Sequence, residues 1–261
     1  MAFDKNELIL DKVRSLAAHD LSTGEMLFRL TSLEDPNLTC TAEGEEVTDA
    51  VGAVITTLYR SKKATFSATN SLISLDLAAA QYGAKKEVAD TDAKILDYTY
   101  DILTIADGSA KLKHKPANKD DVKFIYSVEN GEVGKSFKAA AQASATEFVI
   151  DDEGVITVPT SLTGKIYVEY QFETENAVRI VNKASEFPEA CSVVIYAYFR
   201  DKCNENIVYS GKVICPKAKL NPESVELALT STGKHAFELT MMKDYCTEEG
   251  EDQLFTIIVA E

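Results

Sequence analysis

The feature that most constrains this chain is a succession of short alternating segments separated by turn residues. Apolar and polar side chains alternate within each segment, the pattern of a β-strand with one buried face. The segment 165–172 alternates strictly, and the acidic turn 151–154 before 155–158 is typical of a hairpin. Further strands are predicted at 26–30, 54–59, 64–68, 102–105, 122–126, 148–150, 193–199, 207–209 and 254–259. The sequence therefore predicts a mainly β fold, with a tight polar turn at 60–63.

Only two segments have the spacing of a helix, 7–16 and 71–83. For the second, Asn70 or Ser71 is the expected N-cap, and Gly83 lies where a left-handed C-cap residue belongs. One face of this flanking helix is predicted to pack against a sheet through Leu72, Leu75, Ala79 and Tyr82. The histidine of the later segment 235–239 is expected to serve as a structural hydrogen-bonding group in a strand.

The middle of the chain has its own run of strands and turns. It follows a polar break at 85–92 and contains a basic loop at 111–116. About 80 residues are enough for a small core, so we predict an inserted Ig-like β-sandwich at 94–175. The flanking segments 1–93 and 176–261 then form the two parts of one outer domain, a β-sandwich or barrel with one flanking helix.

The charge of the chain limits its functions. Its 261 residues include 42 Asp and Glu against 27 Lys and Arg, a net charge of −15, which opposes binding to nucleic acid by phosphate neutralisation. High negative charge either keeps a protein soluble or lets a polyanion slide past without sticking. The apolar runs are shorter than a bilayer span, and the first residues do not resemble a signal peptide. We therefore expect a protein that is neither secreted nor membrane-bound.

No motif for catalysis or metal binding stands out. The five cysteines lack a C-x-x-C pair and the three histidines are far apart, so we expect reduced thiols and no zinc site. The segment Gly134-Lys135-Ser136 is not a phosphate loop, because Glu129 occupies the place of the first glycine. Instead, 128–133 is predicted as a hairpin with an Asn-Gly turn. The sequence predicts no catalytic residue, no metal site, no cofactor and no enzyme.

Two segments carry a family resemblance. The first covers 45–55 and 59–72, where acidic residues with Asp49 and Gly52 precede a predicted hairpin and a Leu- and Ala-rich helix. The second covers 227–239 and 254–259, which read as closing strands. Together they are about a third of the chain, and they resemble the major tail tube proteins of long-tailed bacteriophages; the insertion at 94–175 departs from the smallest members.

This resemblance implies an assembly. Six subunits would close into a ring whose strands form one continuous barrel, and stacked rings would form a virion tail tube built in the host cytoplasm. Its acidic lumen would let DNA pass without specific binding. The partners implied are further copies of the chain, a tape-measure protein, a tail terminator, and baseplate or tip proteins, with no membrane.

The resemblance also suggests roles for particular residues. The acidic loop at 43–49 would lie at the ring-to-ring contact or the lumen mouth, the paired lysines would meet carboxylates of the neighbouring ring, and the arm 1–20 would reach an adjacent subunit. The stacking set comprises Glu43, Glu45, Glu46, Asp49, Lys62 and Lys63. The expected lumen-facing residues of strands 54–59 and 64–68 are Thr57, Thr65 and Ser67.

Other classes of protein remain open. A capsid decoration or head–tail connector protein is also β-rich and acidic, and only its polymer shape would distinguish it. A β-sandwich adhesin or carbohydrate-binding module is a second alternative, although the chain has no Trp for sugar stacking. An enzyme on a β scaffold ranks last, because no catalytic cluster is visible.

Overall fold

The computed structural model describes residues 7–204, 206–222, 225–228, 233–243 and 253–260. The chain divides into two units, which we call the outer unit and the inserted unit. Met1–Lys86 and Ile180–Glu261 form the outer unit, and Glu87–Arg179 form the inserted unit. Both units are built mainly from β-strands, which confirms the predicted fold class.

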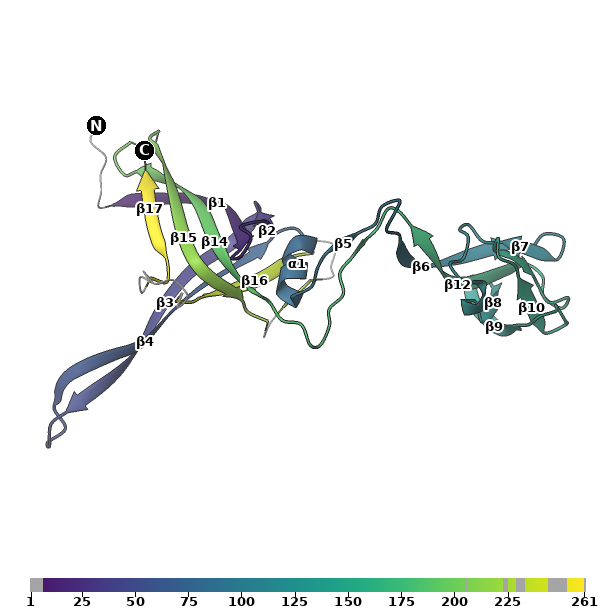
Figure 1. Cartoon of the computed structure of the whole chain (residues 1–261), viewed down its shortest axis with the longest axis horizontal. Coiled ribbons are helices and arrows are strands. Elements are labelled where there is room, and N and C mark those ends of the chain that lie inside the picture. Colours follow the sequence, from purple (N-terminus) through teal and green to yellow (C-terminus); the bar gives the residue numbers. More distant parts are fainter. Residues whose placement is uncertain (1–6, 205, 223–224, 229–232, 244–252, 261) are drawn as a thin grey trace. The chain divides into compact units, whose positions relative to one another are not determined.

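The outer unit is one nearly closed, barrel-like sheet (Figure 1). Its strand order is β2-β1-β14-β15-β16-β4-β3, and β17 pairs with β15 off this path. All these pairs are antiparallel. The strands are β1 (Leu8–Asp20), β2 (Met26–Leu30), β3 (Leu33–Thr48), β4 (Val54–Asn70), β14 (Ala190–Asp201), β15 (Val208–Leu220), β16 (His235–Met241) and β17 (Thr256–Ala260).

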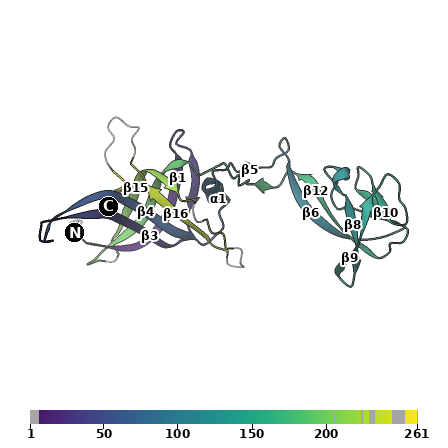
Figure 2. The same ribbon diagram turned by 90° about the horizontal axis from the view of Figure 1, so that it is seen from below.

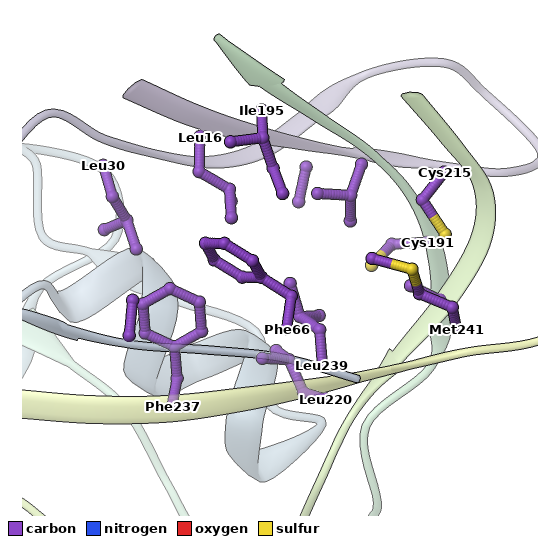
Figure 3. Packing of buried hydrophobic residues seen from close by; sticks show 14 of the residues in the cluster. Leu16, Leu30, Phe66, Cys191, Ile195, Cys215, Leu220, Phe237, Leu239 and Met241 are labelled. Atoms are coloured by element: carbon purple, nitrogen blue, oxygen red, sulfur yellow. The ribbon is translucent and has the colours of Figure 1, made fainter. Parts of the chain in front are cut away.

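The core of the outer unit lies on the inner face of this sheet. Phe66 and Phe237 pack with Leu16, Leu30 and Ile195 in one buried cluster (Figure 3). Cys191, Cys215 and Met241 gather at one end of the same cluster. Burial raises the pKa of Cys191 to about 12 and that of Cys215 to about 11, so both remain protonated thiols and behave as small apolar side chains.

The predicted helix at 7–16 is wrong, because these residues lie in strand β1. β1 pairs with β14 from Leu8 to Asp20, and the side chain of Leu16 is fully buried in the core. Register shifts at Leu10/Lys12 and Val13/Ser15 interrupt the two-residue alternation. The interrupted strand therefore has apolar residues at helix-like spacing. The expected arm at 1–20 is likewise a paired strand of its own subunit from Leu8 onward, and residues 1–6 lie outside the described residues.

The predicted turn at 60–63 is also wrong. β4 runs without a break from Val54 to Asn70, and β3 pairs with it on both sides of this segment. Between the pairs Thr41↔Lys63 and Glu43↔Arg60, β4 carries one extra residue and Ser61 has a φ of 53°. These residues form a β-bulge, which has the polar composition of a turn but does not reverse the chain.

Helix α1 (Leu75–Tyr82) is shorter than predicted. Ser74 is the N-cap and accepts a hydrogen bond from the amide of Leu77, whereas Gly83 is the left-handed C-cap as expected. The predicted packing face needs correction, because Leu72 lies outside the helix and both Leu72 and Leu75 are exposed. Ala79 is buried and Tyr82 is half-buried, and the buried residues of the helix are Leu77, Ala78, Ala79 and Gln81.

A buried polar contact explains this helix orientation. His235 on β16 is fully buried, and its Nε2 donates to Oε1 of Gln81 at 2.5 Å. The Gln81 amide donates to the carbonyl of Ala236 at 3.1 Å, and His235 Nδ1 accepts from the amide of Ser74 at 3.4 Å. Burial lowers the pKa of His235, so its neutral form ties α1 to the sheet. The helix turns its glutamine inward because this bond requires it.

The inserted unit has a seven-stranded sheet with its own core. Its order is β6-β12-β8-β9-β10-β11-β7, and only the pair β9–β10 is parallel. The Asn130-Gly131 turn joins β8 to β9 as predicted. Buried residues such as Phe148, Ile156 and Ile166 fill the core. The strands are β6 (Ile95–Thr104), β7 (Ser109–Lys111), β8 (Phe124–Glu129), β9 (Glu132–Ala139), β10 (Glu147–Ile150), β11 (Val155–Thr157) and β12 (Lys165–Thr174).

Short elements complete the inserted unit. The pair β5 (Glu87–Val88) and β13 (Val178–Arg179) closes its two ends, where Arg179 Nε donates to the carboxylate of Glu87 at 2.8 Å. A 3₁₀ turn, η1 (Lys119–Asp121), precedes β8. Among the residues that the structure describes, no helix is long and apolar enough to cross a membrane, and no cluster of three His, Cys, Asp or Glu could hold a metal ion.

Acidification should destabilise the outer unit through His235. In the unfolded chain His235 takes up a proton near pH 6.5, whereas burial lowers its pKa in the folded chain. The stability that neutral His235 contributes is therefore fully present above pH 6.5 and is lost as the pH falls below it. We expect the melting temperature to fall between pH 7.5 and 5.5, and to fall less in His235→Asn. Differential scanning calorimetry of both proteins would measure this, and equal pH slopes would contradict the assignment.

Candidate assembly surface

The β3–β4 hairpin extends past the core of the outer unit. The two strands run side by side beyond the rest of the sheet (Figures 1 and 2). Every residue of β3 from Thr39 to Thr48 is exposed, and in β4 the same holds from Val54 to Lys63 except for Thr57. Buried positions begin only at Ala64. We call residues 39–63 the ribbon.

Apolar side chains lie on both faces of the ribbon. Tyr59 is 74% exposed and lies over Gly44, where an added Cβ would come within 3.2 Å of the ring. Leu58, the residue before Tyr59, points to the opposite face and pairs with Glu45. The exposed apolar residues of the ribbon are Val47, Val51, Val54, Ile55, Leu58 and Tyr59. A two-stranded ribbon of this composition is marginal alone in water and indicates a surface that a partner covers.

The charged residues of the ribbon lie in strands rather than in a loop. Glu43, Glu45 and Glu46 belong to β3, which corrects the predicted acidic loop at 43–49. Arg60 contacts Glu45 at 3.6 Å, and Lys63 contacts Glu43 at 3.8 Å. These pairs are long and exposed to solvent, so they contribute little to stability.

Asp49 shapes the turn at the tip of the ribbon. Its Oδ1 accepts hydrogen bonds from the amides of Val51 at 3.0 Å and Ala53 at 2.8 Å. Gly52 has a φ of 86°, a backbone conformation that residues other than glycine rarely adopt. This turn leaves Val51 89% exposed at the tip. The structure therefore gives Asp49 a local structural role as well as its place on the ribbon.

The residues expected to face a lumen do not share one face. Thr65 and Ser67 are half-buried on the face of β4 opposite the core residue Phe66. The bulge at Ser61 adds one residue and reverses the alternation, so Thr57 lies on the other face, beside Gly44. Thr57 and Thr65 are an even number of residues apart, so a regular strand would place both on one face. The bulge places them on opposite faces.

The face with Thr65 and Ser67 continues across the sheet with charges of both signs. On β16, Thr240 pairs with Thr65 and Glu238 pairs with Ser67. Lys219 on β15 then pairs with Thr240. This surface is polar and made of small side chains next to β4, but it is not uniformly acidic.

Within the described residues of the outer unit, three strands pair with only one other strand. β3 pairs only with β4, β2 only with β1, and β17 only with β15. Unpaired backbone groups at an edge can accept another strand, and natural proteins usually cover them. β17 adds Ile257 and Ile258 as exposed apolar residues beside its edge. The unpaired edges are a second feature that suits contact with further copies.

The sequence analysis did not single out Leu58, Tyr59 or Ile55 as surface residues. The segment 54–59 that contains them has the β-branched and aromatic composition of a strand, which does not show how many of its residues the core covers. The segment 43–46 of β3, Glu-Gly-Glu-Glu, is a weak signal that this hairpin leaves the core, because a central core strand would not carry these residues.

The outer unit is thus a nearly closed sheet with an exposed apolar ribbon in a mainly β protein. The chain belongs to the YomU/Tube protein family, whose model matches residues 8–252. This family points to a structural protein of the phage tube type and to a virion tail component, which confirms the sequence resemblance at this coarser level. The match includes the whole resembling segment 227–239, of which 229–232 lie outside the described residues, and it ends before the segment 254–259. A comparison with curated proteins gives no match.

The Asp49 turn should be locally important and globally dispensable. Asp49→Ala removes two hydrogen bonds at the exposed tip, so we expect amide exchange at Val51 and Ala53 to accelerate by roughly fivefold. The melting temperature should change by less than about 2 °C, because the ribbon lies outside the core. Hydrogen exchange with mass spectrometry and calorimetry would measure both.

A matched control exists in the inserted unit. Asp151 makes the same contacts, accepting from the amides of Glu153 and Val155 at 2.9 and 2.8 Å. There the turn residue Gly154 packs near Leu112. Asp151→Ala should therefore lower the melting temperature more than Asp49→Ala. An equal or larger loss for Asp49→Ala would contradict the view that the ribbon is separate from the core.

Proposed function

We propose that this chain is the repeating subunit of the tail tube of a long-tailed phage. Six subunits form a ring, rings stack along one axis, and DNA passes through the bore. The tape-measure, terminator, and baseplate or tip proteins meet the tube along its bore or at its ends. Family membership supports the tube, and the geometry of the outer unit supports the way in which copies join.

The ribbon carries this proposal, because it is apolar on both faces. A surface that lies flat against a partner needs only one apolar face, whereas Leu58 and Tyr59 point in opposite directions. Covering both side chains requires insertion between two surfaces. A neighbouring ring provides such a groove where two of its subunits meet, so each ribbon enters the next ring.

Edge pairing supports closure of the ring. An edge strand such as β3 or β17 of one copy adds to an edge of the next, and the backbone hydrogen bonds continue around the circle. This contact is heterologous, since a different edge of each copy takes part, and its rotation closes at a fixed number of subunits. A closed ring leaves few unpaired strand edges and so avoids uncontrolled aggregation.

Charges on the ribbon support its contact with a neighbouring ring. Within the described part of the chain, Glu46 and Lys62 take part in no ion pair, while Lys63 and Arg60 make only long contacts. These side chains can exchange their partners for charges on the neighbouring ring. A charged rim around an apolar centre is the usual composition of a specific protein interface.

Passage of DNA without binding is supported by the charge of the chain as a whole. A net charge of −15 per subunit repels phosphate in every copy of the assembly. Beside Thr65 and Ser67 the sheet carries charges of both signs, with Glu238 on β16 and the lysines Lys217 and Lys219 on β15. The proposal therefore predicts a duplex that meets no adhesive surface.

The ribbon should be required for stacking but not for folding. Leu58→Ser with Tyr59→Ser removes one apolar side chain from each face, so we expect single rings or subunits instead of long tubes. Both residues are exposed, so the melting temperature of the unassembled subunit should stay within about 2 °C of the unchanged chain. Negative-stain electron microscopy and calorimetry would measure the two effects.

Charge reversal gives a second arm of this experiment. Lys62→Glu with Lys63→Glu should leave folded rings and prevent normal stacking. Phe187→Ser is the matched control, because Phe187 is 63% exposed in the outer unit but lies outside the ribbon, and it should form tubes normally. Tubes of normal length from both ribbon variants would refute the proposed contact.

Assembled tubes should not retain DNA. At about 0.1 M salt, a short duplex mixed with tubes should sediment no more than it does alone, because the chain cannot neutralise phosphates. Cosedimentation with a fluorescent duplex would test this. Saturable binding at micromolar duplex concentration that weakens as salt is added would show an adhesive surface and contradict the conduit.

A further inference from the structure

One sheet face of the inserted unit carries a group of exposed tyrosines. The adjacent strands β6, β12 and β8 place Tyr167 directly opposite both Ile102 and Tyr126, and Glu169 opposite Tyr100. Tyr98 lies two residues before Tyr100 in β6. We call this surface the tyrosine face, formed by Tyr98, Tyr100, Ile102, Phe124, Tyr126, Tyr167 and Glu169.

The tyrosine face is the outer side of a strand layer whose inner side is core. Ile166, Val168 and Tyr170 alternate with its members along β12 and are buried. By contrast, Tyr98 is 63% exposed and Tyr100 is 59% exposed. Strand geometry holds these rings in one layer, because alternate residues of adjacent strands point the same way. The aromatic surface therefore extends over three adjacent strands.

A central carboxylate holds the rings in place. Glu169 accepts a hydrogen bond from the Tyr167 hydroxyl at 2.5 Å and another from the Tyr98 hydroxyl at 2.8 Å. The Tyr167 ring also stacks with Tyr100, with 5.4 Å between centroids, and meets Tyr126 edge to face at 6.2 Å. Ordered rings lose little conformational freedom when a ligand binds, which favours affinity.

The same hydrogen bonds fix the charge states. Those from Tyr167 and Tyr98 lower the pKa of Glu169, and the bond to Glu169 raises the pKa of Tyr167 to about 12. Glu169 is thus an anion and the phenols are neutral across the physiological pH range. A ligand meets one carboxylate surrounded by neutral aromatic rings.

Charge on and around the tyrosine face is mixed. Residues 87–179 contain 17 Asp and Glu against 10 Lys and Arg. On this face Lys165 and Glu173 of β12 join Glu169, Lys138 of β9 pairs with Phe124, and Glu147 of β10 pairs with Lys138. Three glutamates thus lie among two lysines, so the face has no run of charge of one sign that would strongly attract an anionic or a cationic polymer.

We infer that the tyrosine face binds a neutral polysaccharide. A sugar ring has an apolar C–H side that can lie on an aromatic ring and hydroxyl edges that can donate to Glu169 and to the neighbouring Gln171. An apolar protein surface would instead bury the Glu169 carboxylate without new donors, which is costly. An exposed surface across three strands also suits an extended chain of sugars rather than a small molecule in a cavity.

This inference can be tested on the full chain in any assembly state. The chain is immobilised, and dextran, laminarin, galactan and mannan, four neutral polysaccharides, are passed over it by surface plasmon resonance. We expect at least one to bind, and Tyr100→Ala to weaken that binding at least about tenfold, as loss of a central aromatic contact does. Glu169→Gln should also weaken it, because the phenols lose their anionic acceptor.

Controls distinguish the tyrosine face from other surfaces. Phe187→Ala removes an equally exposed aromatic ring from the outer unit and should bind as the unchanged chain does. Because the chain has no Trp, its fluorescence comes from 11 tyrosines, of which four lie on the tyrosine face, so binding there should change the emission of the unchanged chain more than that of Tyr100→Ala. The inference is overturned if none of the four polymers binds, if Tyr100→Ala binds equally well, or if only anionic alginate or cationic polylysine binds. None of these results bears on tube assembly.

Discussion

The backbone pairing of β3 with β4 is the interaction on which the rest of the structure depends. Near Phe66 this pairing closes the sheet over the core, and beyond the bulge at Ser61 it continues into solvent. One ladder of hydrogen bonds therefore belongs to the folded subunit at one end and to the assembly surface at the other. The bulge reverses which side chains point to which face, and beyond it the adjacent residues Leu58 and Tyr59 place apolar side chains on both faces of the ribbon.

This arrangement sets two requirements against each other. An exposed ribbon with Leu58 and Tyr59 favours association of any two copies, whereas a net charge of −15 disfavours it. Specific association then needs shape and local charge together, which a groove in a neighbouring copy can supply. The inserted unit has a core of its own and leaves the sheet of the outer unit intact, so it is free to carry a separate surface such as the tyrosine face.

Much of the strand pattern could be predicted because alternation is a local property. Segments such as 165–172 and 193–199 contain regular strands, and Asn130-Gly131 forms the predicted turn. The errors at 7–16 and 60–63 share one cause. Bulges insert a residue, so a bulged strand loses its period and takes on the spacing of a helix or the composition of a turn. The packing face of α1 was missed because Gln81 is polar and is buried only through its bond to His235.

The sequence alone determined the class of fold, the acidic charge and the resemblance to tube proteins, because composition and alternation are carried by single residues and their neighbours. Only the tertiary structure decided which apolar residues remain exposed. Tyr59 and Phe66 are both aromatic residues on the same face of β4, yet one lies in solvent and the other in the core. The difference arises because β16 pairs with β4 only from Ala64 onward, and pairing between distant segments leaves no mark on either segment alone.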